Sequence, residues 1–415
     1  MKSTDLKKVA IIGAGASGLL SSIILSRRNF QIDIFEQNIK VAKKILASGN
    51  GRCNISNTSL ETKHFFGKDR DFVKNGLKQF GFKDFQKFAD SISLYLDIKD
   101  DGKVYPLSNE AKSVAHLLEI MAKKGGVNIF LESFVEKVWK NGDGKFQVQT
   151  SSEKFQNYDY LIVATGSNSA SHLGGNMSGY KIAESFKHKI ELLYPSLAQL
   201  QIKDKNFISK ASGVKLYSIV KTYINGNLEN TVEGDLLFTK YGVSGFSILD
   251  SSQIISQELL KGSTVELGLD LIPKIDIQEL ENMLFSVKIE KISVEEQFLS
   301  LLPQKLFNII LENLNIKKDS LFSELDSRKV KKLVHKIKDF RLTITETNGF
   351  KGSEVTGGGV DTGQVNPKTM ESKIEKNLYF TGEVLDIIGK RGGYNLHFAW
   401  ASGYLASQSI VSIET

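Results

Sequence analysis

The stretch that decides the fold is VAIIGAGASGLL, residues 9–20, followed by QIDIFE at residues 31–36. An apolar run from Val9 to Ile12 leads into a glycine turn, a helical pattern follows, and a second apolar run ends at Glu36. Strand, glycine turn, helix, strand and acid in this order are typical of a dinucleotide-binding fold. A merely structural glycine turn is the alternative, and a G-x-G-x-x-G pattern alone does not exclude it.

Each residue of this motif has a physical role in holding a dinucleotide. Gly13 permits the tight turn, Gly15 lets the backbone approach a pyrophosphate, and Gly18 lets helix and strand pack closely. The N-terminus of the helix supplies free N–H groups and a positive dipole for the phosphates. Glu36 lies 18 residues beyond Gly18, where an acid accepts hydrogen bonds from a ribose 2′-hydroxyl and disfavours a 2′-phosphate.

Two further strands favour FAD over NAD. Residues 160–164 (YLIVA) end in Thr165-Gly166, and residues 378–380 (LYF) end in Thr381-Gly382-Glu383. Because ligands bind at the carboxyl ends of parallel strands, both ends would reach the same edge of a cofactor. Residues 389–406 (GKRGGYNLHFAWASGYLA) predict a glycine turn that opens a helix near Asn395. The N-terminus of this helix would face the flavin pyrimidine, and plain sheet cover is the alternative.

The composition indicates a cytoplasmic chain with a sizeable core. It has 415 residues, 41% of them hydrophobic, and a single cysteine, which excludes an internal disulfide. The apolar run 9–25 is interrupted by glycines and serines, so we expect no membrane span. A net charge of +7 favours anionic partners such as nucleic acid, although lysine-rich codon usage explains it equally well.

Five blocks occur in one order: the glycine turn with Glu36, ASGNGRCNISN at 47–57, FTKYGVSGFSILDSS at 238–252, VTGGGV at 355–360, and TGEVLDIIGKRGGYNLHFAWASG at 381–403. This array resembles the BaiN/RdsA (YhiN-like) family of FAD-dependent oxidoreductases, also labelled aminoacetone-oxidase-like. The resemblance spans nearly the whole chain. Two positions depart from the family pattern: Asn50 replaces a glycine, and Gly245-Phe246 replaces Gly-Pro. Both changes are expected to affect loop shape only.

We expect an α/β fold with a discontinuous Rossmann-like FAD-binding domain, an inserted β-barrel-like domain and a helical subdomain. Period-two apolar patterns between about residues 192 and 271 indicate strands of a barrel or sandwich, and Lys-rich helical patterns follow from Asp276. The expected segments are the FAD-binding domain at 1–191 and 377–415, the inserted β-rich domain at 192–275 with return strands at 341–376, and the helical subdomain at 276–340.

The resemblance implies a set of FAD-binding positions, and it places Val135 where such folds hold adenine through the backbone. Glu383 and Asp386 would hold ribityl hydroxyls, with a helix N-cap as the alternative for Asp386. No histidine shows the spacing of a metal ligand, so we expect no metal. The expected FAD contacts are Gly13, Gly15, Ala16, Ser17, Gly18, Glu36, Gln37, Lys44, Ser48, Gly49, Gly51, Arg52, Asn54, Val135, Thr165, Gly166, Gly382, Glu383, Asp386, Gly393, Tyr394 and Asn395.

Cys53 and Arg52 are the catalytic candidates. Their stretch, residues 47–57, is a glycine-rich polar loop, and the resemblance places it against the isoalloxazine ring. Arg52 would favour a thiolate at Cys53, whereas a thiol would donate a proton beside the flavin. Packing against the cofactor and an inert buried thiol are the alternatives. Arg52 is expected to stabilise an anion of reduced flavin or substrate, and Asn54 and Asn57 to form turns and contact flavin or substrate.

The resemblance implies a reductase mechanism with NAD(P)H as a transient reductant of FAD. Hydride would pass to an electron-poor C=C bond and an acid would protonate the neighbouring carbon. The family includes enzymes that convert a uracil of large-subunit (23S) ribosomal RNA to dihydrouridine, and members linked to bile-acid reduction. The alternatives are a small-molecule reductase, an amine oxidase of the aminoacetone type, and an FAD-dependent RNA-binding factor without turnover.

Several residues outside the nucleotide fold are weaker candidates. His397, two residues into the last helix, contacts substrate or is a satisfied structural histidine, and Tyr241, Ser244 and His335 are candidates for a substrate site. If RNA is the substrate, a basic run is expected to line one broad helix face, and an ordinary solvated helix is the alternative. This run comprises Arg328, Lys329, Lys331, Lys332, Lys336 and Lys338.

Overall fold

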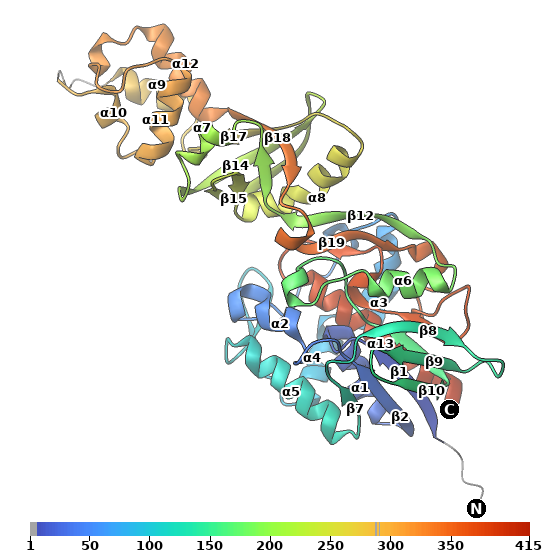
Figure 1. The fold of residues 1–415 in the computed structure, drawn as a ribbon. Helices are drawn as coiled ribbons and strands as arrows, with labels where there is room; N and C mark the ends of the chain where they lie inside the picture. The colour runs from blue at the N-terminus through green and yellow to red at the C-terminus, as the bar shows by residue number, and fades with distance from the viewer. Residues whose placement is uncertain (1–5, 287–288, 290) are drawn as a thin grey trace, which may run out of the picture. The chain divides into compact units, whose positions relative to one another are not determined.

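A computed structural model describes residues 6–286, 289 and 291–415 of the chain (Figure 1). The chain forms two compact units. The first combines the residues up to Leu193 with Val355–Thr415, and the second comprises Tyr194–Glu354.

The first unit is built on a five-stranded parallel sheet with the order β20-β11-β1-β2-β7. From Val9 onward, β1 is buried, as expected for a central strand covered on both faces. β2 lies on one side of β1 and the later strand β11 on the other, so the strand order reverses at β1, which is the topology that creates a ligand crevice at the strand ends. The strands are β1 Lys7–Ile12, β2 Phe30–Phe35, β7 Asn128–Phe130, β11 Tyr160–Val163 and β20 Leu378–Phe380.

Helix α1 (Ala16–Ser26) packs against α13 (Tyr394–Glu414) and α5 (Ala111–Lys124). Small residues allow α1 and α13 to approach closely. A Cβ at Gly403 would lie 2.7 Å from the backbone oxygen of Ser17. Ser21 Oγ donates to the Gly403 carbonyl (3.1 Å) and Ser407 Oγ to that of Ser21 (3.3 Å). These contacts hold the middle of α13 against α1 within one core.

Smaller sheets and helices complete the first unit. Asp143-Gly144 lies in the turn between β8 and β9. The antiparallel sheets are β8 Val135–Lys140, β9 Phe146–Thr150 and β10 Lys154–Tyr158; β3 Ser56–Asn57, β6 Lys103–Pro106 and β5 Leu96–Ile98; and β4 Phe65–Phe66 with β21 Ile388–Gly389. The remaining α-helices described in this unit are α2 Lys43–Ala47, α3 Val73–Gln79, α4 Phe82–Ser91 and α6 Ser178–Ser185.

The second unit contains the predicted barrel. It is closed, with the strand order β13-β16-β15-β14-β17-β18. From Ser218 onward, buried and half-buried residues alternate along β14 (Lys215–Ile224), which is the period-two pattern of a strand. The other strands are β13 Leu200–Ile202, β15 Asn227–Phe238, β16 Gly242–Ser244, β17 Val265–Asp270 and β18 Phe340–Thr347, and α7 Lys205–Ser209 and α8 Phe246–Leu260 accompany them.

A helical part of the second unit follows the barrel strand β17, as the sequence predicted. Two of its helices begin with an aspartate cap: Asp276 accepts from the Glu279 N–H (2.7 Å) and Asp326 from the Lys329 N–H (2.8 Å). Leucine, isoleucine and valine side chains on one face of each helix form its core. The helices are α9 Ile277–Phe285, α10 Val294–Gln297, α11 Gln304–Asn313 and α12 Ser327–Lys338.

The chain passes between the units along β12 (Ile190–Ala198) and β19 (Ser353–Val360). The sequence-based boundaries placed all of 341–376 with the inserted domain. In the structure β18 belongs to the barrel, whereas the first unit resumes at Val355. Strand patterns alone do not reveal which sheet a strand joins, and β19 pairs with β12 rather than with a barrel strand.

Within the described residues, no helix combines the length and the apolar composition that a membrane-spanning segment requires.

Candidate functional site

The glycine turn at the end of β1 is open to a ligand at one position and closed by the protein at two others. Gly13 has φ +106°, and a Cβ there would lie 2.4 Å from the Ala164 carbonyl oxygen. A Cβ at Gly18 would lie 2.0 Å from the Gly13 carbonyl oxygen, so helix and strand touch there. At Gly15, in contrast, a Cβ would meet nothing within 4 Å.

This opening fits the pyrophosphate of a dinucleotide. Gly15 is the N-cap of α1, and no side chain caps the helix. The first-turn N–H groups, at Ala16, Ser17 and Gly18, therefore have no intrahelical partner and point toward the space beside Gly15. A helix N-terminus of this kind attracts phosphate through N–H donors and its dipole.

Glu36 braces the turn from the end of β2. Its Oε2 accepts from the Ala14 N–H (2.9 Å), and its Oε1 accepts from the backbone N–H (2.9 Å) and the side-chain amide (2.6 Å) of Asn38. The carboxylate is buried at 7% exposure. Each carboxylate oxygen has two lone pairs, so Oε2 retains acceptor capacity for a ribose hydroxyl.

The ends of β1, β11 and β20 meet at the same edge of the sheet, as the sequence predicted. The Gly13 turn lies against Ala164, which precedes Thr165-Gly166. The Gly382 N–H donates to Ser402 Oγ (2.9 Å), and a Cβ at Gly382 would lie 3.0 Å from Ser17 Oγ. Positions from all three strands therefore surround the N-terminus of α1.

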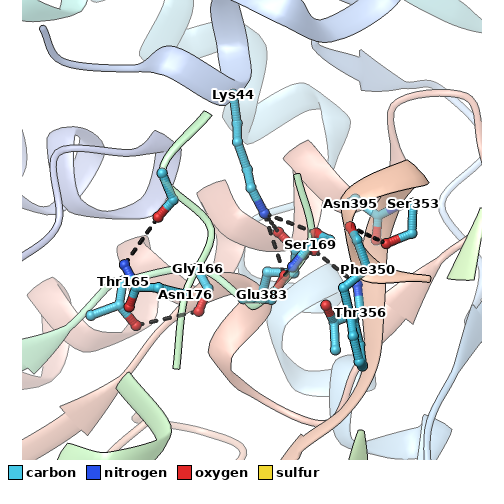
Figure 2. A network of polar contacts seen from close by, with 12 residues as sticks. Lys44, Thr165, Gly166, Ser169, Asn176, Phe350, Ser353, Thr356, Glu383 and Asn395 are labelled. Atoms are coloured by element: carbon cyan, nitrogen blue, oxygen red, sulfur yellow. Dashed lines mark hydrogen bonds and ion pairs between the residues drawn. The ribbon is translucent and has the colours of Figure 1, made fainter. Parts of the chain in front are cut away.

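Glu383 is the centre of a polar network (Figure 2). Lys44 extends toward it and forms an ion pair with Oε2 (2.8 Å). Oε1 accepts from Ser167 Oγ (2.7 Å), Ser169 Oγ (3.2 Å) and the Thr356 N–H (3.2 Å). Ser167 and Ser169 were not among the predicted site residues. The signal that would have found them is the polar run that directly follows Thr165-Gly166 at the predicted ligand edge.

Asp386 lies in a second cluster of charges. Its Oδ2 accepts from the Lys68 N–H (2.9 Å), and Lys68 Nζ bridges Glu191 (2.8 Å) and Asp361 (3.1 Å). Burial raises the pKa of Asp386 to about 6, and the negative charges of Glu191 and Asp361 add to this effect. Asp386 therefore changes its protonation state near neutral pH. Lys68, Glu191 and Asp361 carried no local sequence signal of this role.

The loop around Cys53 consists largely of left-handed residues. Gly49, Asn50, Gly51 and Cys53 have φ values of 57°, 56°, 82° and 62°. Asparagine tolerates this region better than other non-glycine residues do, which explains how Asn50 occupies a position where a glycine was expected. Cysteine has no such preference, and its conformation costs of order 1 kcal/mol or more, as is found at functional sites.

Of the two forms that the sequence left open for Cys53, its surroundings favour the thiol over the thiolate. The side chain has 0% exposure, and burial raises its pKa to about 11 despite a hydrogen bond with Ser48. Arg52 makes other contacts: its Nε donates to the Gly49 carbonyl (3.3 Å), and its guanidinium carbon lies 5.5 Å from the centre of the half-buried Tyr105 ring. Neighbours in sequence therefore face different surroundings.

The Cys53 loop and the last helix are joined by three hydrogen bonds. Asn57 Nδ2 donates to the Gly392 carbonyl (3.0 Å), and Trp400 Nε1 donates to the Ile55 carbonyl (2.9 Å). Ser56 Oγ contacts His397 Nδ1 at 2.8 Å. Two of the five sequence blocks, residues 47–57 and 381–403, are thus directly joined in the structure.

His397 is a satisfied structural histidine. Its Nε2 donates to the Phe80 carbonyl (2.9 Å), so Nδ1 accepts from Ser56. The ring is fully buried, and burial lowers its pKa to about 4. The neutral imidazole is therefore fixed in one tautomer, and it positions the start of α13.

The glycine turn before α13 is packed against the protein. A Cβ at Gly393, where φ is +94°, would lie 2.2 Å from the Ser56 carbonyl oxygen. The Asn395 side chain accepts from the Gly389 N–H (2.7 Å) and donates to its carbonyl (2.8 Å). The buried Tyr394 ring packs on His64 (4.7 Å) and Phe65 (5.9 Å). These side chains hold the loop, which leaves mainly backbone groups for a ligand.

The remaining predicted positions occupy several places in the first unit. Ser48 Oγ donates to the Ile45 carbonyl (2.7 Å), and Gln37 binds Gly174 and Asn176. When its side-chain amide is turned so that the nitrogen faces the two carbonyls, Asn54 donates to Ser56 (2.9 Å) and Val104 (3.1 Å). Val135 is buried at the start of β8 and pairs with Thr150 of β9.

The candidates of the second unit do not form one cluster. Tyr241 is exposed in the turn before β16, Ser244 is buried at the end of β16, and His335 is exposed on α12. Lys338 of the basic run is also unavailable, because its Nζ binds Asp270 (2.7 Å) and the Ile275 carbonyl (2.6 Å). Across the described ranges, no group of three or more His, Cys, Asp or Glu residues is placed to hold a metal ion.

Comparison with known proteins identifies close relatives over the whole chain. A family model described as "HI0933-like protein Rossmann domain" matches residues 7–409. A 3-dehydro-bile acid delta(4,6)-reductase of Clostridium scindens is 34% identical, covering 97% of this chain and 99% of the relative. A ribosomal RNA dihydrouridine synthase of Haemophilus influenzae is 32% identical (96% and 97%), and one of Escherichia coli is 29% identical (98% of each).

Solved structures support the fold. The 3-ketosteroid delta1-dehydrogenase of Sterolibacterium denitrificans, determined with 1,4-androstadiene-3,17-dione, superimposes with a TM-score of 0.53 at 12% identity. The match covers 99% of this chain and 100% of that one.

Proposed function

This chain belongs to the HI0933-like family and is an FAD-dependent oxidoreductase, and from this premise we propose that it reduces a uridine of large-subunit ribosomal RNA to dihydrouridine, with NAD(P)H as the reductant. The names of its relatives share one type of reaction, the reduction of a C=C bond. The observation that best supports FAD binding is the open N-terminus of α1 beside Gly15, which no side chain caps.

The proposed reduction needs NAD(P)H as its single reductant. NAD(P)H and one proton convert uridine to dihydrouridine and NAD(P)⁺. The 5,6-double bond of uracil is conjugated to a carbonyl, so the hydride adds at C6 and the proton at C5. When bound, FAD supplies the hydride transfer between nicotinamide and substrate. The protein must hold both partners, exclude water and supply the proton.

We assign FAD binding to the residues around α1. The first-turn N–H groups hold the pyrophosphate, and Glu36 accepts from a ribose hydroxyl. Glu383 and Asp386, which lie beyond the end of β20, are the assigned acceptors for ribityl hydroxyls. Lys44 neutralises Glu383 and limits its repulsion of the phosphates, since the two form an ion pair at 2.8 Å.

Cys53 is the proposed proton donor. Because its pKa is raised to about 11, it carries a proton throughout the physiological range. It is therefore in the protonated form that a proton donor requires, and not in the thiolate form that a nucleophile requires. Its side chain has no exposed surface in the structure, so this role requires that substrate binding opens the left-handed loop 48–53.

The test uses the purified enzyme with NAD(P)H and ribosomal RNA that lacks the modification. Cys53→Ala should retain FAD and reduce dihydrouridine formation by roughly 10²–10⁴-fold, the usual contribution of a general acid. Flavin reduction by NAD(P)H, followed by absorbance, should be nearly unchanged, because this half-reaction uses no acid from the protein. Cys53→Ser should recover part of the activity. Full activity of Cys53→Ala would restrict the residue to packing.

A small enone is the second candidate substrate. The 34% identity with the bile acid reductase favours it, because that relative matches as fully as the RNA-modifying ones. One assay distinguishes the two candidate substrates: NAD(P)H oxidation is measured with each of them in turn. NAD(P)H oxidation that depends on a 3-keto-4-ene steroid and not on RNA would select the small molecule and overturn the RNA assignment.

A further inference from the structure

The second unit contains a cavity of about 250 Å³. It lies among α7, α11, α12 and β18. Its lining includes three cationic side chains, two aromatic rings and one acid, namely Lys203, Lys336, Arg341, Phe207, Phe340 and Asp204. The volume is below the roughly 300–1,000 Å³ of most small-molecule sites, so the cavity suits one part of a larger ligand.

Two phenylalanine rings form an aromatic wall of this cavity. The Phe207 and Phe340 rings are nearly parallel, at 15°, with centroids 6.5 Å apart. Phe340 is buried, whereas Phe207 is half-buried. Lys336 Nζ lies 5.3 Å from the centre of the Phe340 ring. The wall therefore offers an aromatic face beside a cation, a combination suited to a flat, electron-rich group.

Arg341 is held in place at the edge of the cavity. Its guanidinium carbon lies 3.8 Å from the centre of the Tyr223 ring, and its Nε donates to Asp339 (2.7 Å). A guanidinium has five N–H donors, and this bond engages only one of them. The side chain is thus pre-oriented to bind an anion with its terminal amino groups.

A row of three lysines on α12 leads into the cavity. Lys329, Lys332 and Lys336, spaced three and four residues apart, share one face of the helix, and Lys336 also lines the cavity. The far side of the helix is buried through Val330 and Val334. Throughout the described residues, no carboxylate forms an ion pair with a lysine of this α12 row. Lys338 of the same helix shows the contrast, because Asp270 neutralises it.

We propose that the α12 row and the cavity together bind single-stranded RNA. The row holds successive phosphates, and the cavity receives one unstacked base against Phe207. The choice of RNA as the polymer rests on the proposed function, whereas the geometry of the surface is independent of the reaction. In a duplex the bases are stacked and cannot reach an aromatic wall, so the surface selects single-stranded or locally opened RNA.

The test measures binding of a fluorescein-labelled 12-nucleotide oligouridylate to the FAD-loaded enzyme by anisotropy at several salt concentrations. The double variant Lys329→Glu, Lys332→Glu should bind at least about tenfold more weakly. Its plot of log K against log salt should be flatter by about 1.4, since each phosphate contact on a single strand contributes about 0.7. The matched control is Lys305→Glu, Lys317→Glu, which reverses two exposed lysines outside the row and should change binding little.

Replacing Phe207 separates stacking from charge. Phe207→Leu keeps apolar volume and removes the ring, so affinity should fall about tenfold with an unchanged salt slope. Phe207→Trp should retain affinity, and thermal unfolding of each variant checks that the fold persists. A 12-base-pair duplex should compete poorly.

Two results of these binding experiments would contradict the RNA-binding inference. Equal losses in the row variant and its control would reduce the effect to net charge. Competition by inorganic phosphate with no effect of Phe207→Leu would indicate an anion site only. Failure of the proposed reaction is read separately: if uridine is not reduced but binding responds as predicted, the RNA surface stands and the reaction assignment fails. If wild type and variants reduce uridine equally, the reaction assignment stands and the RNA surface fails.

Discussion

Helices α1 and α13 both begin at a glycine and neither has a side-chain cap, yet their N-termini have opposite surroundings. A Cβ at Gly15 would meet nothing within 4 Å, whereas one at Gly393 would lie 2.2 Å from the Ser56 carbonyl oxygen. The first glycine leaves room for a ligand. The second allows the chain to approach itself. A glycine turn before a helix therefore does not by itself indicate ligand contact at the glycine.

The contrast extends to the side chains around each turn. At α1 no side chain caps the first-turn N–H groups, and Glu36 stabilises the turn by accepting from the Ala14 N–H. Near α13, Asn57 and Asn395 hold the loop by hydrogen bonds to Gly392 and Gly389. The α13 turn is thus held by contacts within the protein. Only those of its polar groups that make no such contact remain available to a cofactor.

Gly15→Val should have the largest effect, and on the cofactor alone. The valine side chain would occupy the space assigned to the pyrophosphate, so FAD retention should fall from about one per chain to almost none. The fold should persist, because a Cβ at this position contacts nothing in the protein. Released flavin and far-ultraviolet circular dichroism check both parts. Normal FAD content in the variant would show that the opening at α1 is not the cofactor site.

Gly393→Ala should have the opposite profile. Alanine at φ +94° is strained, and its Cβ would overlap the Ser56 carbonyl oxygen. The FAD-free protein should lose roughly 2–4 kcal/mol of unfolding free energy, measured in urea. Gly15→Val serves as the control, with a loss below about 1 kcal/mol under the same conditions. Equal stability losses in the two variants would remove the contrast between the turns.

Asp386→Asn gives a smaller effect that depends on pH. Burial raises the pKa of Asp386 to about 6, so the folded chain keeps a proton that the unfolded chain loses between about pH 4 and pH 6. Stability therefore falls as the pH rises through this window. The asparagine variant lacks this loss, and well above pH 6 it should be more stable by up to about 3 kcal/mol in the FAD-free state, since the shift is roughly two pKa units.

Urea unfolding of both proteins at about pH 4 and about pH 7.5, one at the lower edge of this window and one above it, checks this prediction. The wild type should lose more stability than the variant between the two conditions. Identical changes would mean that Asp386 titrates normally and that the charges of Glu191 and Asp361 do not act on it.

Features encoded in local patterns were predictable from the sequence. The turn 13–18 with Glu36 follows from residue order, the barrel strands from period-two alternation, and the helices after Asp276 from helical periodicity. Thr165-Gly166 and Gly382 could also be brought to one sheet edge, because parallel strands present their carboxyl ends together.

Contacts between distant residues were not predictable in this way. Lys68 and Asp386 are 318 residues apart in the chain, and Ser56 and His397 are 341 apart. Neither pair leaves a local signal. Adjacency to Arg52 could not decide the form of Cys53, since burial is the main influence on the pKa of the thiol. The basic run on α12 was visible, but the neutralisation of Lys338 by Asp270 depends on the tertiary fold.

The most direct test of the central claim is nucleoside mass spectrometry of large-subunit ribosomal RNA from cells that lack this gene. Dihydrouridine should be absent at one site, wild-type protein should restore it, and Gly15→Val, which keeps the fold but loses FAD, should not. Dihydrouridine at unchanged levels in the deletion strain, or full restoration by Gly15→Val, would contradict an FAD-dependent reduction of ribosomal RNA.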